Sequence, residues 1–370
     1  MGSVNLDNTG SGSAITLSSD GTSLLLDGTA VGGGADLYTA NESSPSAQPS
    51  ATGTNSIAIG DSAISTNTNS FAGPLSRAGG TNSFAMGIGN NGTSYGTVGN
   101  AHGIAMGQYA KAQGNYDIAI GRGANATGEN DSIAIGRATT ANSGYAVAIG
   151  YSNVASGNYS IAMGYDTTAS ASNATAIGSA SNYTSKSNAS GEGSVAIGGG
   201  TATATDSMAL GDSRASGTDS FAAQITNNTT SYGASGVNSI AMGYLADADY
   251  RSVAIGYNVG GSGSYGISLG SDSGVGIYAS SAAIGRNVQS TASNQVSIGG
   301  STQDVRISET YTLPRVDGSA NQVLTTDGSG AVSWAAAGGG GGGASNINGL
   351  SDGKTSTTNY GLGTDSIAGL

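Results

Sequence analysis

A five-residue motif, Ser-[Ile/Val]-Ala-[Ile/Met]-Gly, recurs through the middle of the chain and limits its possible folds more than any other feature. Ser132-Ile133-Ala134-Ile135-Gly136 is one of its copies. The closing glycine returns every 13 to 15 residues, apart from three insertions of about six residues. A period this short predicts stacked coils, each of which needs its neighbours to complete a core. The glycines that we expect to turn the coils are Gly60, Gly87, Gly107, Gly121, Gly136, Gly150, Gly164, Gly178, Gly198, Gly211, Gly243, Gly256, Gly270, Gly285 and Gly299.

Alternation within the motif places Ile133 and Ile135 on one face of a strand and Ser132 and Ala134 on the other. A stretch of smaller residues follows each glycine, so one coil is expected to comprise a strand, a turn, a short strand and a turn. We expect the large residues to stack inside as ladders of Ile, Val and Met. This predicts an all-β fold, a parallel β-solenoid of about 17 coils with a period of about 14 residues. Such a thin core leaves Ala and Tyr surface uncovered, which favours association of several rods, and a three-fold bundle suits an elongated shaft.

Composition excludes several function classes. The 370 residues include 65 Gly, 9% charged residues, one His and no Cys, and the net charge is −12. A chain without Cys has no thiolate nucleophile, and one with a single His has no His-rich metal cluster. The sequence contains neither a basic patch for nucleic acid nor an apolar stretch of roughly 18 residues that could span a bilayer. We therefore expect no catalysis, no cofactor, no metal, no nucleic-acid partner and no membrane insertion.

The repeat resembles the YadA-like head repeat of trimeric autotransporter adhesins, over residues of about 54–300. The resemblance implies a left-handed parallel β-roll, packed as a homotrimer, whose surface binds host ligands. The flanks depart from that family, because we find neither its signal peptide nor its membrane-anchoring segment.

The flanks are instead similar to another class of protein. The C-terminal stretch from Tyr311 to Trp334 is similar to a segment common in bacteriophage tail-fibre and other virion appendage proteins, and residues 15–31 have the same character. This second resemblance implies a structural and adhesive virion fibre that is assembled in the host cytoplasm. Its partners would be itself, other virion proteins and a glycan or protein receptor on the host surface. A glycan-degrading tailspike and a fragment of a bacterial trimeric surface adhesin are the alternatives.

Composition changes along the chain divide it into six parts. Pro and Ser residues indicate a linker before the repeats. Asp317-Gly318 and Asp327-Gly328 indicate turns of a small β cap behind them. The expected parts are an N-terminal attachment piece (1–34), a linker (35–53), the β-roll (54–300), a β cap (301–337), a glycine hinge (338–343) and a C-terminal tail (344–370).

The insertions and a column of tyrosines are the candidate ligand sites. Loops that present Tyr and Asn from a rigid rod suit saccharide or receptor contact, although they also suit spacers or packing between chains. Tyr also follows the anchor glycine in several coils, where other coils have Arg122, Arg137 or Arg286. Stacking would align these residues into a ligand-binding stripe or an inter-chain contact. The candidates are Asn91 and Tyr95, Tyr183, and Asn228 and Tyr232 in the insertions, and Tyr151, Tyr165, Tyr244 and Tyr257 in the column.

His102 lies near the first insertion and is expected to be an isolated surface residue rather than a metal ligand on a three-fold axis. Thr203 and Thr205 suggest an ice-binding array, but neighbouring coils do not repeat the pattern.

Overall fold

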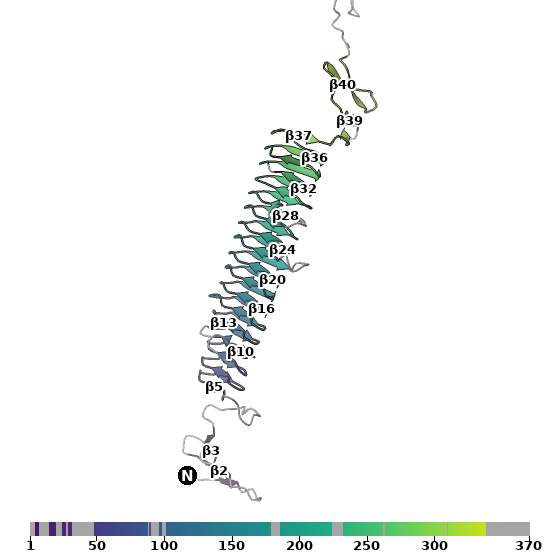
Figure 1. Cartoon of the computed structure of the whole chain (residues 1–370). Helices are drawn as coiled ribbons and strands as arrows, with labels where there is room; N and C mark the ends of the chain where they lie inside the picture. Colours follow the sequence, from purple (N-terminus) through teal and green to yellow (C-terminus); the bar gives the residue numbers. More distant parts are fainter. Residues whose placement is uncertain are drawn as a thin grey trace, which may run out of the picture. The chain divides into compact units, whose positions relative to one another are not determined.

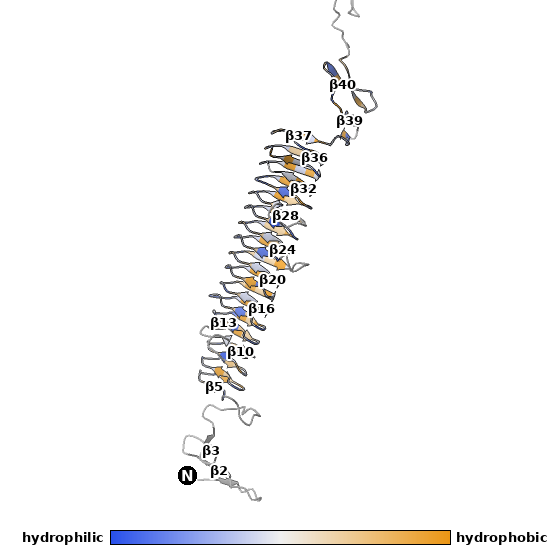
Figure 2. Ribbon diagram, in the orientation of Figure 1, coloured by the Kyte–Doolittle hydropathy of each residue, from blue (hydrophilic) through white to orange (hydrophobic). Residues whose placement is uncertain are grey.

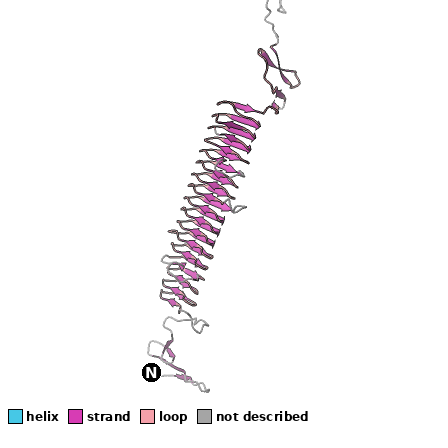
Figure 3. Ribbon diagram, in the orientation of Figure 1, coloured by secondary structure: helices cyan, strands magenta, loops and turns pink. Residues whose placement is uncertain are grey.

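A computed structural model shows a chain built from strands (Figure 3). It describes residues 48–87, 89, 96–97, 101–178, 186–223, 232–261, 263–308 and 310–337, together with four short N-terminal strands. Within these residues no helix is present. The chain divides into two compact units, Met1–Arg251 and Ser252–Leu370.

The first unit contains a stack of two-stranded coils (Figure 1). Each motif forms a strand of the first sheet, and the small residues after its glycine form a strand of the second sheet. The first-sheet strands are β6 (Ile57–Ala58), β8 (Phe71–Ala72), β10 (Phe84–Met86), β12 (Ile104–Met106), β14 (Ile118–Ile120), β16 (Ile133–Arg137), β18 (Val147–Tyr151), β20 (Ile161–Tyr165), β22 (Thr175–Gly178), β24 (Val195–Ile197), β26 (Met208–Leu210), β28 (Phe221–Ala223) and β30 (Ile240–Met242).

The second sheet of this unit also runs through every coil. Its strands are β5 (Ser50–Ala51), β7 (Ile64–Ser65), β9 (Arg77–Ala78), β11 (Gly96–Thr97), β13 (Lys111–Ala112), β15 (Asn125–Ala126), β17 (Thr140–Ala141), β19 (Val154–Ala155), β21 (Thr168–Ala169), β23 (Asn188–Ala189), β25 (Thr201–Ala202), β27 (Arg214–Ala215), β29 (Gly233–Ala234) and β31 (Asp247–Ala248).

Parallel pairing aligns equivalent residues of successive coils. Ile133 pairs with Val147, and Ile135 with Ile149, across β16 and β18. β5 pairs with β7, so the coils begin at Ser50, inside the stretch expected to be a linker.

The second unit repeats this architecture over fewer coils. Its first sheet contains β32 (Val253–Tyr257), β34 (Ile267–Ser271), β36 (Ala282–Arg286) and β37 (Val296–Ile298), and its second sheet contains β33 (Gly260–Gly261) and β35 (Gly274–Gly276). The described residues of the two units amount to about 16 coils. The prediction of an all-β parallel β-solenoid with a 14-residue period is confirmed.

Two small antiparallel hairpins follow the last coil. β38 (Val305–Ile307) pairs with β39 (Tyr311–Leu313), and β40 (Gln322–Thr326) pairs with β41 (Val332–Ala336). The turn between β40 and β41 contains Asp327-Gly328, as expected, and Asp327 Oδ1 accepts hydrogen bonds from the Ser329 and Ala331 N–H groups.

The N-terminal strands form a separate four-stranded antiparallel sheet. They are β1 (Val4–Leu6), β2 (Ile15–Ser19), β3 (Leu24–Leu26) and β4 (Thr29–Val31), paired in chain order.

The interior of the coils is the reverse of the one predicted. Ala134 and Ala148, at the centre of the motif, are completely buried, and so are Ala141 and Ala155 on the second sheet. The large motif residues point outward instead: Ile197, for example, is 38% exposed. The predicted internal ladders of Ile, Val and Met are therefore wrong, and alanine ladders fill the core.

Coil length explains this inversion. One coil has about 14 residues, and several of these form its two corners. The remaining strands are short, and the two sheets lie too close together for large side chains between them. Alanine fills that gap without forcing the backbone apart, whereas larger residues would overpack it. The motif serine is small enough to lie inside, and in several coils its hydroxyl donates to the carbonyl three residues before it. Ser207 Oγ, for example, donates to the Ala204 carbonyl at 2.7 Å.

The anchor glycines turn the chain with backbone angles that other residues rarely adopt. All of those named above have positive φ, which reaches 124° at Gly150. A Cβ at Gly150 would collide with the Gly164 carbonyl oxygen of the next coil. Glycine is thus required there both by conformation and by the closeness of the stacked backbones.

We expect Gly150→Ala to destabilise the protein by about 3 kcal/mol or more, because it adds backbone strain to a collision with a neighbouring coil. Gly123→Ala is the matched control, since a Cβ there meets nothing closer than 3.9 Å and Ala138 holds the equivalent position with φ of 56°. Thermal unfolding of both variants measures the difference. Equal melting temperatures would show that the close approach at Gly150 is unimportant.

Candidate functional site

The outward residues of the first sheet form a continuous apolar surface, which we call the first-sheet outer face. In the first unit it consists of two columns, from the second and fourth motif positions of each coil. Met163, Ile177 and Ile197 of the fourth-position column are 37%, 36% and 38% exposed. Figure 2 shows hydrophobic residues recurring along these strands. Soluble monomers seldom expose an apolar patch this long, so the face is suited to contact with another protein surface.

The predicted tyrosine column lies along the rim of the same face. Tyr151 stacks on Tyr165 with 4.9 Å between ring centroids, and the Arg137 guanidinium lies 5.1 Å from the Tyr151 ring. Val147 and Ile149 flank the buried Ala148 and point to the outer side of β18, and Tyr151 follows on the same strand after the exposed Gly150. This position beside the apolar residues favours the interpretation that the column packs between chains.

The remaining tyrosines of that column are surface residues. Tyr244 is 40% exposed in the first unit, and Tyr257 is 55% exposed in the second. Tyr257 pairs with Ser271, and Ser271 with Arg286, so the second unit has no uninterrupted tyrosine ladder among its described strands.

Two stacked pairs lie at the corner just before the first-sheet strands, and sequence reasoning missed them. Tyr145 stacks on Tyr159 at 4.8 Å, and His102 stacks on Tyr116 at 4.5 Å. His102 also shares a hydrogen bond of 3.0 Å with Asn82, so it is not the isolated residue that we expected. All five residues have positive φ. Each of them comes immediately before the first residue of a motif, and this shared position could have been found in the sequence.

The structure describes one of the five candidate residues in the insertions. Asn91, Tyr95, Tyr183 and Asn228 lie outside the described residues. Tyr232 is described and half-buried, directly before β29.

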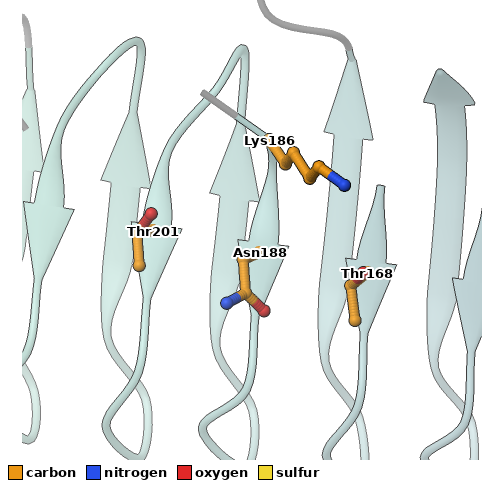
Figure 4. A pocket seen from close by; sticks show the side chains of 4 residues that line it. All are labelled: Thr168, Lys186, Asn188 and Thr201. Atoms are coloured by element: carbon orange, nitrogen blue, oxygen red, sulfur yellow. The ribbon is translucent and has the colours of Figure 1, made fainter. Parts of the chain in front are cut away.

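A shallow groove opens on the opposite, polar side of the coils, which we call the second-sheet outer face. Thr168, Asn188 and Thr201 line its floor from the consecutive strands β21, β23 and β25 (Figure 4). Lys186 forms its wall, and the groove has a volume of about 290 Å³. Lys186 Nζ lies 2.5 Å from Asp166 Oδ2, and both residues occupy the same corner position in consecutive coils. The groove is therefore rich in hydrogen-bonding groups and has no net charge.

Two half-buried or buried carboxyl groups have raised pKa values. Burial raises the pKa of Asp117, which replaces the motif serine in its coil, although hydrogen bonds from Ser132 and Gly114 oppose this effect. Burial, helped by the charge of Asp249, raises the pKa of Asp247 on the second-sheet outer face to about 6. Asp117 Oδ1 accepts from the Ser132 N–H and hydroxyl at 2.9 and 2.7 Å, so its role is structural.

The described residues contain no group of three or more His, Cys, Asp or Glu side chains suited to hold a metal ion. In the same part of the chain there is no helix of the length and hydropathy needed to cross a membrane.

Comparison with known families identifies the repeat. The model of the YadA head domain repeat matches residues 51–72, 100–124, 112–131, 126–153, 155–181, 185–201 and 234–258. These segments of the chain are similar to YadA head domain repeats. The matched segments cover coils whose first-sheet outer face and groove are described above. No curated protein matches the chain.

We expect Asp247→Asn to change the pH dependence of stability. A carboxyl group whose pKa is raised in the folded state stabilises it most below its ordinary value of 3.8, and this stabilisation is lost as the pH rises through about 6. Because Asp247 is half-exposed, we expect the variant to gain about 1 kcal/mol over the wild type between pH 4 and pH 7. Denaturant unfolding at both pH values measures this, with the exposed Asp317→Asn as control. The same gain in both variants would contradict the assignment to Asp247.

Proposed function

We propose that the chain is a non-catalytic, homotrimeric, adhesin-like fibre of a phage virion that contacts the host cell surface. The observation that carries the trimer is the first-sheet outer face, which leaves large apolar side chains more than one third exposed through many coils. The family of the repeat supports the adhesin-like character, and the similarity of the flanks to virion appendage proteins supports the virion.

Identical copies can cover this face efficiently. The coils of one chain are evenly spaced at about 4.8 Å, so a second chain with the same spacing can match it over the whole length. Each large side chain removed from water contributes up to about 1.5–3 kcal/mol, in proportion to the area that becomes buried. Three chains around one axis would each direct the first-sheet outer face inward. The second-sheet outer face would then form the outside of the fibre.

A bacterial surface adhesin is the second candidate, and the match to the YadA head domain repeat favours it. Both candidates share the trimer and the adhesive surface. They differ in the particle or cell that carries the fibre.

We expect the paired substitution Ile135→Lys with Ile149→Lys to abolish the trimer, because it buries two unpaired charges in each copy of the interface. Light scattering should give three times the 35.6 kDa of one chain for the wild type and one chain for the variant. Thr140→Lys on the second-sheet outer face is the control and should remain trimeric. A wild-type protein with the mass of a single chain would refute the proposed assembly.

We expect mass spectrometry of purified phage particles from the source culture to detect this chain, and antibodies against the coils to label fibres on those particles. Cell envelopes from the same culture provide the comparison. If the chain is detected in the cell envelope and not in the phage particles, the virion fibre is wrong and the bacterial adhesin becomes the proposed function.

A further inference from the structure

We propose that the groove lined by Thr168, Lys186, Asn188 and Thr201 binds an internal segment of an uncharged polysaccharide, lying across the strands of the second-sheet outer face. This inference rests on the proposed adhesive function and names the class of ligand and its site.

The position of the groove keeps it accessible in the proposed assembly. Ala169, Ala189 and Ala202 are completely buried, so Thr168, Asn188 and Thr201, which precede them, point away from the core. The outward side of the second sheet is opposite the apolar face that the trimer would cover. The tyrosine column of Tyr151 and Tyr165, by contrast, shares the covered face and is a poorer ligand site.

The groove offers the mixture of donors and acceptors that sugar hydroxyls require. A hydroxyl group donates one hydrogen bond and accepts others, and the Asn188 amide can serve both roles. The side chains of Asn188 and Thr168 make no hydrogen bond to another described side chain or backbone group. Their polar atoms are therefore available to a ligand. Lys186 has two further N–H donors beside the one directed at Asp166.

Charge selects against an acidic polysaccharide. Lys186, the cation that lines the groove, is already neutralised by Asp166 at 2.5 Å. Arg214 lies one strand beyond Thr201, on β27 and outside the lining of the groove, and the chain carries a net charge of −12. An anionic chain would gain little from the groove and would be repelled by the rest of the surface. An uncharged ligand avoids this repulsion and can exchange water hydrogen bonds for those of Asn188, Thr168 and the ion pair.

Shape favours an internal segment over a chain end. The three floor residues lie on consecutive strands, so the floor extends over about 10 Å across the sheet. Gly199 occupies in the third coil the corner position that Asp166 and Lys186 hold in the first two, and it presents no side chain there. Among the described residues, the groove is thus walled by the ion pair and open beyond it, so a polymer can enter and leave without ending inside.

The test uses the full-length chain immobilised for interferometry, with soluble mannan and dextran as uncharged probes and alginate as the acidic probe. We expect at least one uncharged probe to bind with little change between 50 and 500 mM salt, and alginate not to bind. Asn188→Ala should weaken binding about fivefold, as expected for loss of hydrogen bonds to an uncharged ligand. Asn125→Ala is the matched control, because Asn125 occupies the same position of its coil on β15, away from Lys186 and Asp166.

Each other outcome overturns the inference. The inference is wrong if neither uncharged probe binds or if alginate alone binds. It is also wrong if salt strongly weakens binding of the uncharged probe, or if the two alanine variants weaken binding equally. Light scattering of the same samples and binding to host cells report on the proposed function separately. If the Asn188→Ala variant is still a trimer and binds host cells as well as the wild type does, the proposed function stands and the groove is not the ligand site.

Discussion

The narrow interior of each coil determines most of the structure. Two short sheets linked by tight corners leave room mainly for Ala and Ser, with a few larger residues such as Asn153 and Val275. A core of small residues buries little apolar area per coil, so a single chain gains modest stability from it. The large residues remain outside, where they can be buried only by other molecules. In the proposed trimer, one alternating strand would serve both folding and association. Ala134 fills the coil interior, and its neighbours Ile133 and Ile135 would pack between chains.

The same interior accepts larger polar side chains where hydrogen bonds satisfy them. Asn153 lies completely buried, with its Nδ2 bonded to the carbonyls of Ile149 and Gly164 and its Oδ1 accepting from Thr167. Asp117 is held in a similar way by Ser132 and Gly114. In both cases the partners belong to the same coil or an adjacent coil. Asn153 and Asp117 thus each link successive coils.

Much of the architecture could be predicted from the sequence, and one decisive feature could not. The period and the anchor glycines such as Gly136 and Gly150 identified parallel coils, because only close stacking requires glycine at a fixed interval. Alternation showed that Ile133 and Ala134 face opposite ways. It did not show which way was inward, since the usual rule that the larger apolar face forms the core assumes sheets that can separate to about 10 Å. The groove beside Lys186 was equally hidden, because it depends on which corner residues become neighbours after an insertion.

The corner before each first-sheet strand has a consequence for how such a fibre can change. Successive coils place Asn82, His102, Tyr116, Asp131, Tyr145 and Tyr159 there on nearly the same backbone, although these side chains differ in size, charge and polarity. Their backbone conformation is set by the coil, and Tyr116 and Tyr159 are more than half exposed. The corner column can therefore vary in sequence while the scaffold and its assembly stay constant. If the chain is the receptor-binding fibre that we propose, such a column would let recognition diversify one coil at a time.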